Sequence, residues 1–475
     1  MKKSSNGFHA PAPRLFYIQE ALNTTGLKSN MKSGTTRLMQ ENPSETAENG
    51  DFYSCIRPLL RFGKILGLIP VGNLWSDSVD VEKLGFRWKS YPAAISVLIT
   101  LILSINALFS FLDLFRRFAG KGGGNATELA FAAKGPLFYL TVLLIYLFFL
   151  LKAKTMLKLF TTWRKVSNEL NLRVVDETLA RSVKVLATVI YVSASLDFVA
   201  SSLTQFPIIE RTSTQNGKEH GFTPLETYYN RSHPFWAFYI PFHPIVAVIL
   251  LICSLVSVLA WNYADVITIV FSRALYFKFK TLVEETEKRL IPSEEKHQFQ
   301  KLHGITWTEV RRDHLTLCKL LDDVEAFLSP LIFLSYSINI FFICLQLHQG
   351  LTPVPDRTIL DSVDSAWTFL HLIFRLTMMS LTASKINEYA HQIASSIQKC
   401  SSSEYCKEVE RLERMLGTGP LGLSGLGCFV ITRAFMLVVI SVIFTMEIVL
   451  LQTSATGSTT VALQKESPLS KTSNP

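Results

Sequence analysis

Several charged and polar side chains occur inside stretches of this sequence that are otherwise apolar. Asp197 lies within the apolar stretch 185–206, and Arg375 lies within the stretch 366–383. A charged side chain at the centre of a helix in lipid costs about 2.5–3.5 kcal/mol on insertion scales, so it usually faces protein or water. The chemistry that these residues offer is ion pairing and hydrogen bonding. We therefore expect them to face a polar site or a structural partner inside the protein.

No motif of a common enzyme class accompanies them. The sequence lacks Gly-x-Ser-x-Gly, His-Glu-x-x-His, a Walker loop and Cys-x-x-Cys. The glycines at 122–124 are not followed by Gly-Lys-Ser or Gly-Lys-Thr, so they do not predict a phosphate-binding loop. His297, His303 and His314 are too widely spaced in a polar segment to indicate a metal site. We expect neither enzymatic activity nor a cofactor or metal.

The polar residues belong to seven long apolar runs, which set the fold class. Overall 48% of the residues are hydrophobic and 18% are charged, a composition that a large soluble enzyme would also fit. The distribution of the apolar residues along the chain distinguishes the two classes of protein. A helix needs roughly 20 apolar residues to cross about 30 Å of hydrocarbon, and the apolar residues here come in runs of about that length. Seven such runs in series favour a polytopic all-α membrane protein over buried core helices. The runs are 91–114, 135–151, 185–206, 234–261, 327–347, 366–383 and 425–451.

Both ends of the chain are polar. Residues 1–52 are rich in Ser, Asn and Gly and predict a disordered tail without a cleaved signal peptide. Residues 453–475 predict a second, shorter polar tail. An odd number of spans puts the two tails on opposite sides of the membrane.

The basic residues predict which side is which. With the N-terminus in the cytoplasm, the inner segments carry 35 of the 47 Lys and Arg residues and the outer segments carry 10. An excess of Lys and Arg marks the cytoplasmic side, although Arg116 and Arg117 fall on the outer side. The net charge of +9 is spread over juxtamembrane segments, so anionic lipid explains it more simply than nucleic acid.

Glycosylation sequons and cysteines give weaker information on orientation. Asn125 and Asn230 begin sequons in predicted outer loops, while Asn23 begins one in the N-terminal tail and argues the other way. None of the seven cysteines lies in an outer loop, so no extracellular disulfide is expected.

Three inner segments have the apolar periodicity of helices that extend beyond the membrane. They are 264–290, 305–327 and 403–416. Such helices must pack on something, so we expect them to form a bundle together. A solvated, charged hairpin is the alternative.

The last apolar run carries the most specific motif. It follows Gly417-Thr418-Gly419-Pro420-Leu421, contains Thr432-Arg433 and ends with Phe444-Thr445-Met446-Glu447-Ile448-Val449-Leu450-Leu451-Gln452. This resembles the signature of insect gustatory receptors, and its Glu and its ending resemble the sugar (sweet-taste) receptor branch. Met446 stands where that family usually has Tyr. The segment 58–70, with Pro58-Leu59-Leu60 and Gly67-Leu68-Ile69-Pro70, is also similar to the family's N-terminal segment.

The resemblance implies a multi-pass plasma-membrane receptor that acts as a ligand-gated, non-selective cation channel. The implied assembly is a homotetramer or a hetero-oligomer with other gustatory receptors. It would be embedded in membrane lipid and would conduct monovalent and divalent cations. The implied channel domain spans 53–452, with the ligand pocket in 91–383 and the pore helix in 425–452. Inter-subunit contacts would come from 264–326 and 385–424.

A sugar pocket in the outer halves of the spans needs aromatic faces for the sugar ring and fixed polar groups for its hydroxyls. Asp197 is apt because a carboxylate accepts two hydroxyl hydrogen bonds, although pairing with Arg375 is an alternative role. The candidates on the third to sixth spans are Asp197, Gln205, Trp236, Tyr239, His243, Asn339, Gln346, Trp367 and His371. Any one of them could equally be a packing residue.

Four residues near the end of the last span are candidates for the pore. In the family the terminal Gln faces the pore, which corresponds to Gln452 here, and Leu451 and Ile448 would form a hydrophobic constriction. Glu447 lies roughly 140° around the helix from Gln452, so both cannot point at one pore axis. Glu447 could pair with a neighbouring helix or form a cation-attracting ring.

Two other functions share parts of this pattern. A secondary sugar transporter would normally show repeated halves and broken helices, and no repeat is present. An odorant-receptor-like channel subunit would share the topology, but the polar pocket candidates argue against it. The sequence does not specify the sugar or whether a second subunit is needed.

Overall fold

A computed structural model of the chain describes residues 52–75, 81–119, 126–170, 177–205, 223–290, 306–352, 358–400 and 405–466. All of these residues belong to one unit, Ala47–Pro475. The predicted N-terminal tail through residue 51, the sequon residue Asn125 and residues 467–475 lie outside the described residues.

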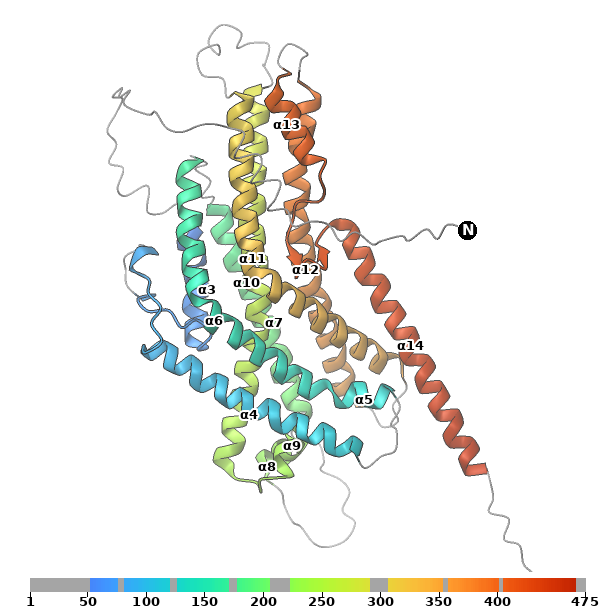
Figure 1. Cartoon of the computed structure of the whole chain (residues 1–475). Coiled ribbons are helices and arrows are strands. Elements are labelled where there is room, and N and C mark those ends of the chain that lie inside the picture. The colour runs from blue at the N-terminus through green and yellow to red at the C-terminus, as the bar shows by residue number, and fades with distance from the viewer. Residues whose placement is uncertain are drawn as a thin grey trace, which may run out of the picture. The chain divides into compact units, whose positions relative to one another are not determined.

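The described residues are almost wholly helical (Figure 1). The elements are α3 Phe52–Ile65, η2 Val81–Lys83, α4 Tyr91–Ala119, α5 Ala126–Ala132, α6 Lys134–Glu169, α7 Glu177–Gln205, α8 Pro224–Ser232, α9 Pro234–Ala237, α10 Pro244–Leu290, α11 Trp307–Leu351, α12 Ile359–Gln398, α13 Lys407–Leu416, β1 Ser424–Gly425, β2 Phe429–Val430 and α14 Arg433–Glu466.

Six of the described helices are long and apolar enough to cross a membrane: α4, α6, α7, α10, α11 and α14. The remaining predicted run lies in α12, which is 40 residues long but carries Asp361, Asp364, His371 and Arg375 among its apolar residues. These polar groups lower its hydropathy, and His371 and Arg375 are buried against other helices. The all-α, polytopic fold class predicted from the sequence is confirmed.

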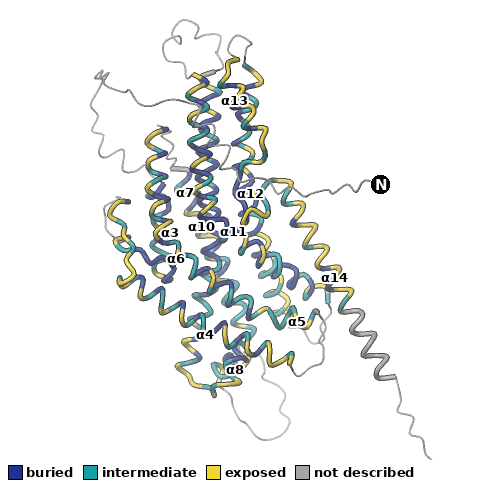
Figure 2. Tube along the Cα trace, in the orientation of Figure 1, coloured by how far each residue is buried: buried dark blue, intermediate teal, exposed yellow. Residues whose placement is uncertain are grey.

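The centre of the bundle is formed by α10, α11 and α12, which pack against one another along their lengths. Figure 2 shows long buried stretches in α10 and α11, whereas α4 and α14 carry many exposed residues. The exposed residues of α4, α7 and α14 include large apolar side chains such as Leu98, Val189 and Leu437. Exposed apolar faces of this kind are stable in lipid, so the burial pattern agrees with a membrane-embedded bundle.

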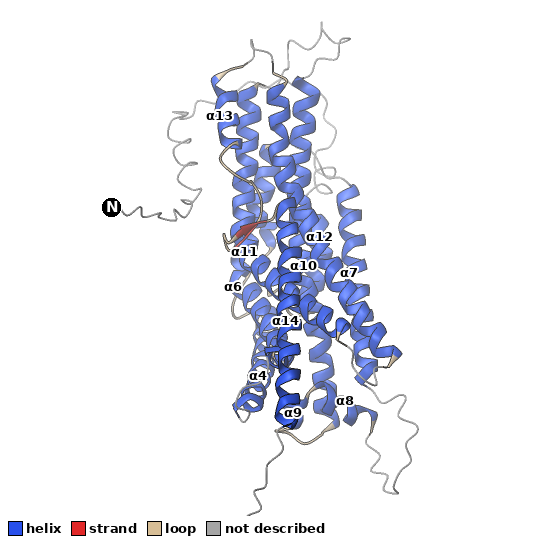
Figure 3. Ribbon diagram, turned by 90° about the vertical axis from the view of Figure 1, so that its right-hand side faces the viewer, coloured by secondary structure: helices blue, strands red, loops and turns tan. Residues whose placement is uncertain are grey.

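Helices α10, α11 and α12 extend past the other spans and meet α13 at one end of the bundle (Figure 3). Val283 of α10, Trp307 and Val310 of α11, Ile393 of α12 and Leu412 of α13 share one apolar cluster. Arg311 of α11 also pairs with Glu408 of α13. The helical periodicity of these segments therefore comes from packing against one another, as the sequence predicted for 264–290, 305–327 and 403–416.

Helix α3, the first helix of the described residues, packs on the bundle through aromatic contacts. Phe52 stacks on Trp163 with ring centroids 4.2 Å apart. The chain then turns at Gly67, whose φ of 71° is a left-handed conformation that glycine adopts without strain. The carbonyl of Leu66 accepts a hydrogen bond from the hydroxyl of Tyr146 at 2.7 Å.

The fourth span begins later than the sequence predicted. Residue 234 starts only the short helix α9, and the spanning helix α10 begins at Pro244. Pro241 and Pro244 explain the difference, because proline lacks the N–H that a helix interior needs and is tolerated in the first turn. The prediction that Trp236, Tyr239 and His243 lie on this span was therefore wrong, since all three precede it.

The last helix also differs from its predicted bounds. Residues 424–430 form a small antiparallel hairpin, β1 with β2, and α14 begins at Arg433 instead of residue 425. Gly427 at the turn has a φ of 71°, a conformation that would end a helix. At its other end the helical backbone continues to Glu466, so part of the predicted polar tail is helical.

Arg116 and Arg117, the two basic residues on the predicted outer side, have a structural partner. They bind the Asp113 carboxylate at 2.6 Å and 2.7 Å, respectively. Arg116 also lies over the ring of Phe238, 3.5 Å from its centroid. The Asp113 carboxylate thus gives both guanidinium groups an ion-pair partner at the end of α4.

The buried imidazole of His233, between α8 and α9, predicts a loss of stability in acid. Burial lowers the pKa of His233 to about 4 from 6.5, and neither ring nitrogen has a hydrogen-bond partner among the described residues. Because the pKa in the folded state is depressed, stability is fully present above about pH 6.5 and is lost as the pH falls toward about 4.

We expect His233→Phe, which keeps a ring between Tyr228 and Phe235, to reduce the fall in unfolding temperature across this pH window. The measurement is thermal unfolding of the detergent-solubilised protein at several pH values, with the exposed His243→Gln as the matched control. An unchanged pH profile in His233→Phe would contradict this assignment.

Candidate ligand-binding site

A cavity of about 810 Å³ lies among the spanning helices and the α5, α8 and α9 segments. This volume is within the range of small-molecule sites. Its lining is rich in charged and amide side chains, an unusual composition for the interior of an apolar helix bundle. The polar lining residues include Asp113, Arg117, Lys134, Asp197, Gln205, Gln346, Gln349, Asp361, Asp364, His371 and Arg375.

One wall of the cavity is formed by α7 and α12, which are joined by side-chain hydrogen bonds at regular helical spacing. Thr368 donates to Asp197 at 2.6 Å, and Ser201 donates to Asp364 at 2.9 Å. One turn further along, the Ser193 hydroxyl lies 2.8 Å from Nδ1 of His371. These contacts fix two carboxylates, Asp197 and Asp364, on the same wall. Lys134 of α6 interacts electrostatically with both carboxylates.

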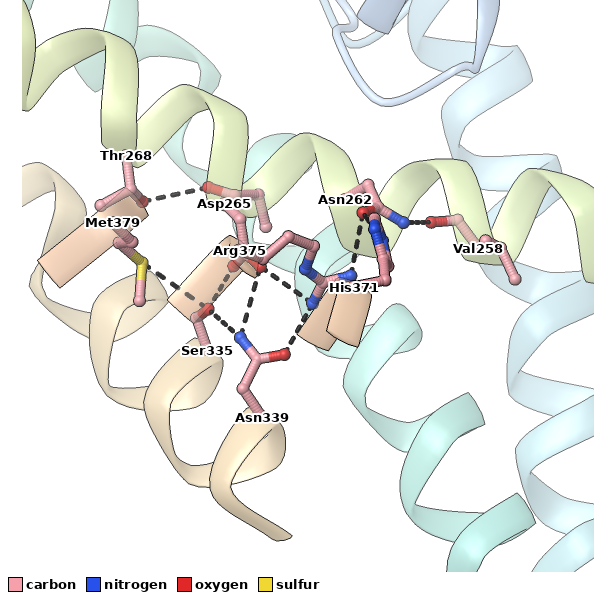
Figure 4. Close-up of polar contacts among 10 residues, drawn as sticks. Val258, Asn262, Asp265, Thr268, Ser335, Asn339, His371, Arg375 and Met379 are labelled. Atoms are coloured by element: carbon pink, nitrogen blue, oxygen red, sulfur yellow. Dashed lines mark hydrogen bonds and ion pairs between the residues drawn. The ribbon is translucent and has the colours of Figure 1, made fainter. Parts of the chain in front are cut away.

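The floor of the cavity is a buried ion pair between α10 and α12 (Figure 4). A guanidinium nitrogen of Arg375 lies 2.9 Å from the carboxylate of Asp265, and each side chain is only 1% exposed. Ser335 and Asn339 of α11 donate to the same carboxylate. Buried charges are tolerated when such additional hydrogen bonds satisfy them.

Asn262 connects this ion pair to the cavity wall. Its side-chain oxygen accepts from Arg375 at 2.9 Å and lies 3.1 Å from Nε2 of His371. Its amide nitrogen donates to the carbonyl of Val258, which fixes the orientation of the amide. We infer that Nε2 of His371 carries the proton and that Nδ1 accepts from Ser193, because this tautomer satisfies both contacts.

A second part of the lining is aromatic. Trp261 lies 5.8 Å from Phe138 and 5.2 Å from Phe342, measured between ring centroids, and all three line the cavity. The Arg375 guanidinium lies over the Trp261 ring, 4.4 Å from its centroid. The cavity thus combines aromatic faces with fixed carboxylates and amides, which suits a compact, neutral ligand with several hydroxyl groups.

The structure brings four of the nine predicted pocket residues into the cavity lining: Asp197, Gln205, Gln346 and His371. Asn339 lies below the floor and is fully buried in the Arg375 network, where its oxygen accepts from Arg375 at 2.6 Å.

The other four predicted residues are absent from the lining, each for a local reason. Trp236 donates to the side chain of Asn106 at 2.8 Å, and Tyr239 packs on Phe109 while 43% exposed. His243 is exposed before α10, and Trp367 is 39% exposed with its N–H toward the Ser193 carbonyl.

Several residues of the site were not predicted from the sequence. Asn262 and Asp265 lie beyond the predicted end of the fourth span, in a segment for which the sequence predicts only a continuing helix. Lys134 and Asp364 lie just before predicted spans, and Trp261 is the last residue of the predicted fourth span. One feature of the sequence could have identified these five residues as candidates for the site. Each is a polar or aromatic residue within about two helical turns of the end of an apolar run.

The predicted pore residues lie on different faces of α14. Glu447 is 4% exposed and pairs with His348 of α11, with Nδ1 and Oε1 3.2 Å apart. Ile448, Leu451 and Gln452 are exposed. Of the two roles considered for Glu447, the structure supports pairing with a neighbouring helix. Arg433, at the start of α14, pairs with Glu388 of α12.

Comparison with known proteins assigns the family. The profile of the trehalose receptor family matches residues 26–461. The chain belongs to the trehalose receptor family. The sugar-receptor branch of the insect gustatory receptors, predicted from the last apolar run, is thereby confirmed.

Curated relatives of this trehalose receptor family member come from Drosophila melanogaster. It is 24% identical over 407 residues to gustatory receptor for sugar taste 64a, covering 84% of each chain. It is 25% identical over 409 residues to gustatory receptor for sugar taste 61a, covering 85% of this chain and 88% of the relative. With gustatory receptor 5a for trehalose the identity is 24% over 432 residues, covering 89% and 90%.

A solved structure shows the same fold. The insect olfactory receptor OR5 from Machilis hrabei aligns with a TM-score of 0.59 at 13% identity, covering 85% of this chain and all of that chain. A second structure of OR5, in complex with eugenol, aligns with a TM-score of 0.58. The family member therefore has the helical fold of insect chemoreceptors.

The buried ion pair predicts a strong effect on stability. Arg375→Met leaves the Asp265 carboxylate buried without its cation, and we expect a loss of about 3–5 kcal/mol in the free energy of unfolding. Adding Asp265→Leu to Arg375→Met should recover part of this loss, because the double variant buries no uncompensated charge. Thermal unfolding in detergent and the amount of receptor at the cell surface are the measurements.

Glu388→Gln is the matched control, because it breaks an ion pair whose side chains are 70% and 43% exposed. It should cost less than about 1 kcal/mol. Equal effects of Arg375→Met and Glu388→Gln would contradict the structural importance of the buried pair.

Proposed function

We propose that this receptor is a sugar-gated, non-selective cation channel of the plasma membrane. The sugar binds in the cavity between α7, α10, α11 and α12, and the α14 helices of four subunits line a shared pore. The observation that carries the proposal is a cavity whose lining combines two fixed carboxylates with a cluster of three aromatic rings in edge-on and tilted contact. The sugar-taste relatives support this ligand class.

The chemistry of the cavity matches a sugar better than an apolar volatile. A carboxylate has about four acceptor positions, and Thr368 uses one of those on Asp197. Sugar hydroxyls can donate to the remaining positions, while Gln346 and Gln349 offer both donors and acceptors. Trp261 and Phe138 can cover the apolar face of a sugar ring. An apolar ligand would displace water from the partly buried carboxylates of Asp197 and Asp364 without offering them hydrogen bonds in return.

The exposed face of α14 supports its role in a shared pore. Leu437, Phe444 and Ile448 are 70%, 62% and 55% exposed, so the helix meets lipid or other subunits on most of its surface. Gln452 lies on this exposed face, whereas Glu447 points at α11. In the proposed orientation the N-terminus is cytoplasmic, the end of the bundle bearing α8 and Asn230 is outside, and α13 is inside.

The direct test of the function is to record currents from cells that express this chain alone while a sugar panel including trehalose is applied. Asp197→Ala should raise the sugar concentration for half-maximal current about tenfold or more, because a charge-assisted hydrogen bond contributes about 1.5–3 kcal/mol. Asp323→Ala, which removes an exposed carboxylate of α11 remote from the cavity, should leave it unchanged.

Surface expression separates binding from folding in this experiment. A collapse of surface expression in Asp197→Ala would assign that residue a structural role. Absence of any sugar-evoked current in the wild type, alone or with a second gustatory receptor, would contradict the proposed function itself.

The pore assignment makes a separate prediction. In a four-fold assembly, Gln452→Glu places four negative charges around the axis and should favour divalent cations, while Gln452→Lys should suppress cation current. The sugar concentration for half-maximal current should change little, since the cavity is lined by other helices. Reversal potentials under calcium/caesium bi-ionic conditions measure the effect. If neither substitution alters the reversal potential or the current, Gln452 does not face the ions.

A further inference from the structure

The helix α14 contacts the rest of the described chain through a narrow stripe. Val439, Glu447 and Leu450 are its buried residues between Arg433 and Thr453, and the partly buried Ile443 lies between them. Their spacing of three and four residues puts them on one face of the helix. Glu447 is the single acidic residue of this stripe.

Glu447 is held by His348 near the end of α11. Oε1 of Glu447 lies 3.2 Å from Nδ1 of His348, and the side chains are 5% and 3% exposed. Nε2 of His348 lies 3.4 Å from the hydroxyl of Thr352. Oε2 of Glu447 is buried without a hydrogen-bond partner among the described residues. This acid therefore depends on His348, because a buried carboxylate that loses its partner is strongly destabilised.

The same end of α11 lines the cavity on another face. Gln346 and Gln349 are lining residues on either side of His348 in the sequence, and Gln346 accepts a hydrogen bond from Ser365 of α12 at 3.1 Å. A ligand that binds the amides of Gln346 and Gln349 would act on the helical turn that carries His348.

A second route from the cavity to α14 runs through α5. Phe131 of α5 lines the cavity, and its ring centroid lies 5.9 Å from that of His348. One helical turn earlier, the hydroxyl of Thr127 lies 3.2 Å from that of Thr453 in α14. The cavity and Glu447 are thus separated by only one layer of side chains, formed by Phe131 and His348.

We propose that the His348–Glu447 contact transmits ligand occupancy of the cavity to α14. This inference rests on the proposed function. Binding at Gln346, Gln349 and Phe131 changes the position of His348, and Glu447 follows because His348 is its hydrogen-bond partner among the described residues. A ligand shifts a conformational equilibrium only through different contacts in the two states, and this contact supplies such a difference at α14. His348 and Glu447 are coupling residues and do not themselves touch the ligand.

A double-mutant cycle tests this proposal in the full-length receptor. Glu447→Gln, His348→Phe and the combination are compared for the maximal current evoked by the most effective sugar of the panel, normalised to surface receptor. Each single variant should lower the maximal current by about fivefold or more, and the combination should be no worse than either one. Sugar binding, measured by thermal shift of the purified receptor, should weaken less than the maximal current, because the pair lies outside the cavity and its loss removes only the coupling part of the binding free energy.

Two further variants guard against a merely structural effect. The exchange His348→Glu with Glu447→His restores a complementary pair and should recover at least about half of the wild-type current. Thr445→Val, on the exposed face of α14, should change nothing.

The proposal is overturned if the losses of current in the two single variants multiply in the double variant, or if sugar binding weakens as much as the current. It is also overturned if the exchange variant folds but does not regain current, or if all variants conduct like the wild type. A wild-type receptor that conducts no current with any sugar would instead contradict the proposed function.

Discussion

The ion pair between Arg375 and Asp265 is the constraint on which the rest of the bundle depends. Two charges this deep in an apolar interior are stable only when their remaining hydrogen-bonding groups find partners. Asn262 on α10 and Ser335 and Asn339 on α11 supply most of those partners, and Nε of Arg375 has none among the described residues. The requirement fixes the relative register of α10, α11 and α12, because a displacement of any of the three helices would leave a buried charge without a partner.

The cavity follows from this arrangement. Arg375 lies against the Trp261 ring, and Asn262 orients His371. The buried network around Arg375 therefore positions residues of both the aromatic and the polar parts of the lining. Above it, the hydrogen bonds from Thr368 and Ser201 hold Asp197 and Asp364 in place. The site is therefore formed before a ligand arrives, which reduces the conformational entropy that binding must offset. By contrast, α14 contacts the rest of the described chain through one narrow stripe of buried residues that includes the Glu447–His348 contact, and through the Arg433–Glu388 pair and the Thr453–Thr127 hydroxyls near its two ends.

The sequence predicted the fold well because hydrophobic runs and helical periodicity are local properties of the chain. Asp197, Gln205, Gln346 and His371, predicted from their positions on the outer halves of the spans, all line the cavity. The prediction failed for Trp236, Tyr239 and His243, where Pro241 and Pro244 delay the start of α10. It also missed the partners of the buried groups. The sequence suggests an ion pair between Arg375 and Asp197, but the structure pairs Arg375 with Asp265. No spacing in the sequence relates Glu447 to its partner His348. Such pairings depend on how helices distant in sequence pack together.

The central claim is that the polar cavity is the sugar site, and the access of a thiol reagent tests it most directly. Ala132→Cys introduces a small thiol into the lining, and the exposed native Cys428, which is not a lining residue, serves as an internal reference. The rate at which each thiol of the purified receptor is labelled is followed by site-resolved mass spectrometry with and without the most effective sugar. At a sugar concentration about ten times the dissociation constant, we expect labelling of the introduced cysteine to slow about tenfold while labelling of Cys428 stays constant. Equal rates with and without sugar at the introduced cysteine, in a receptor shown to bind that sugar, would contradict the account.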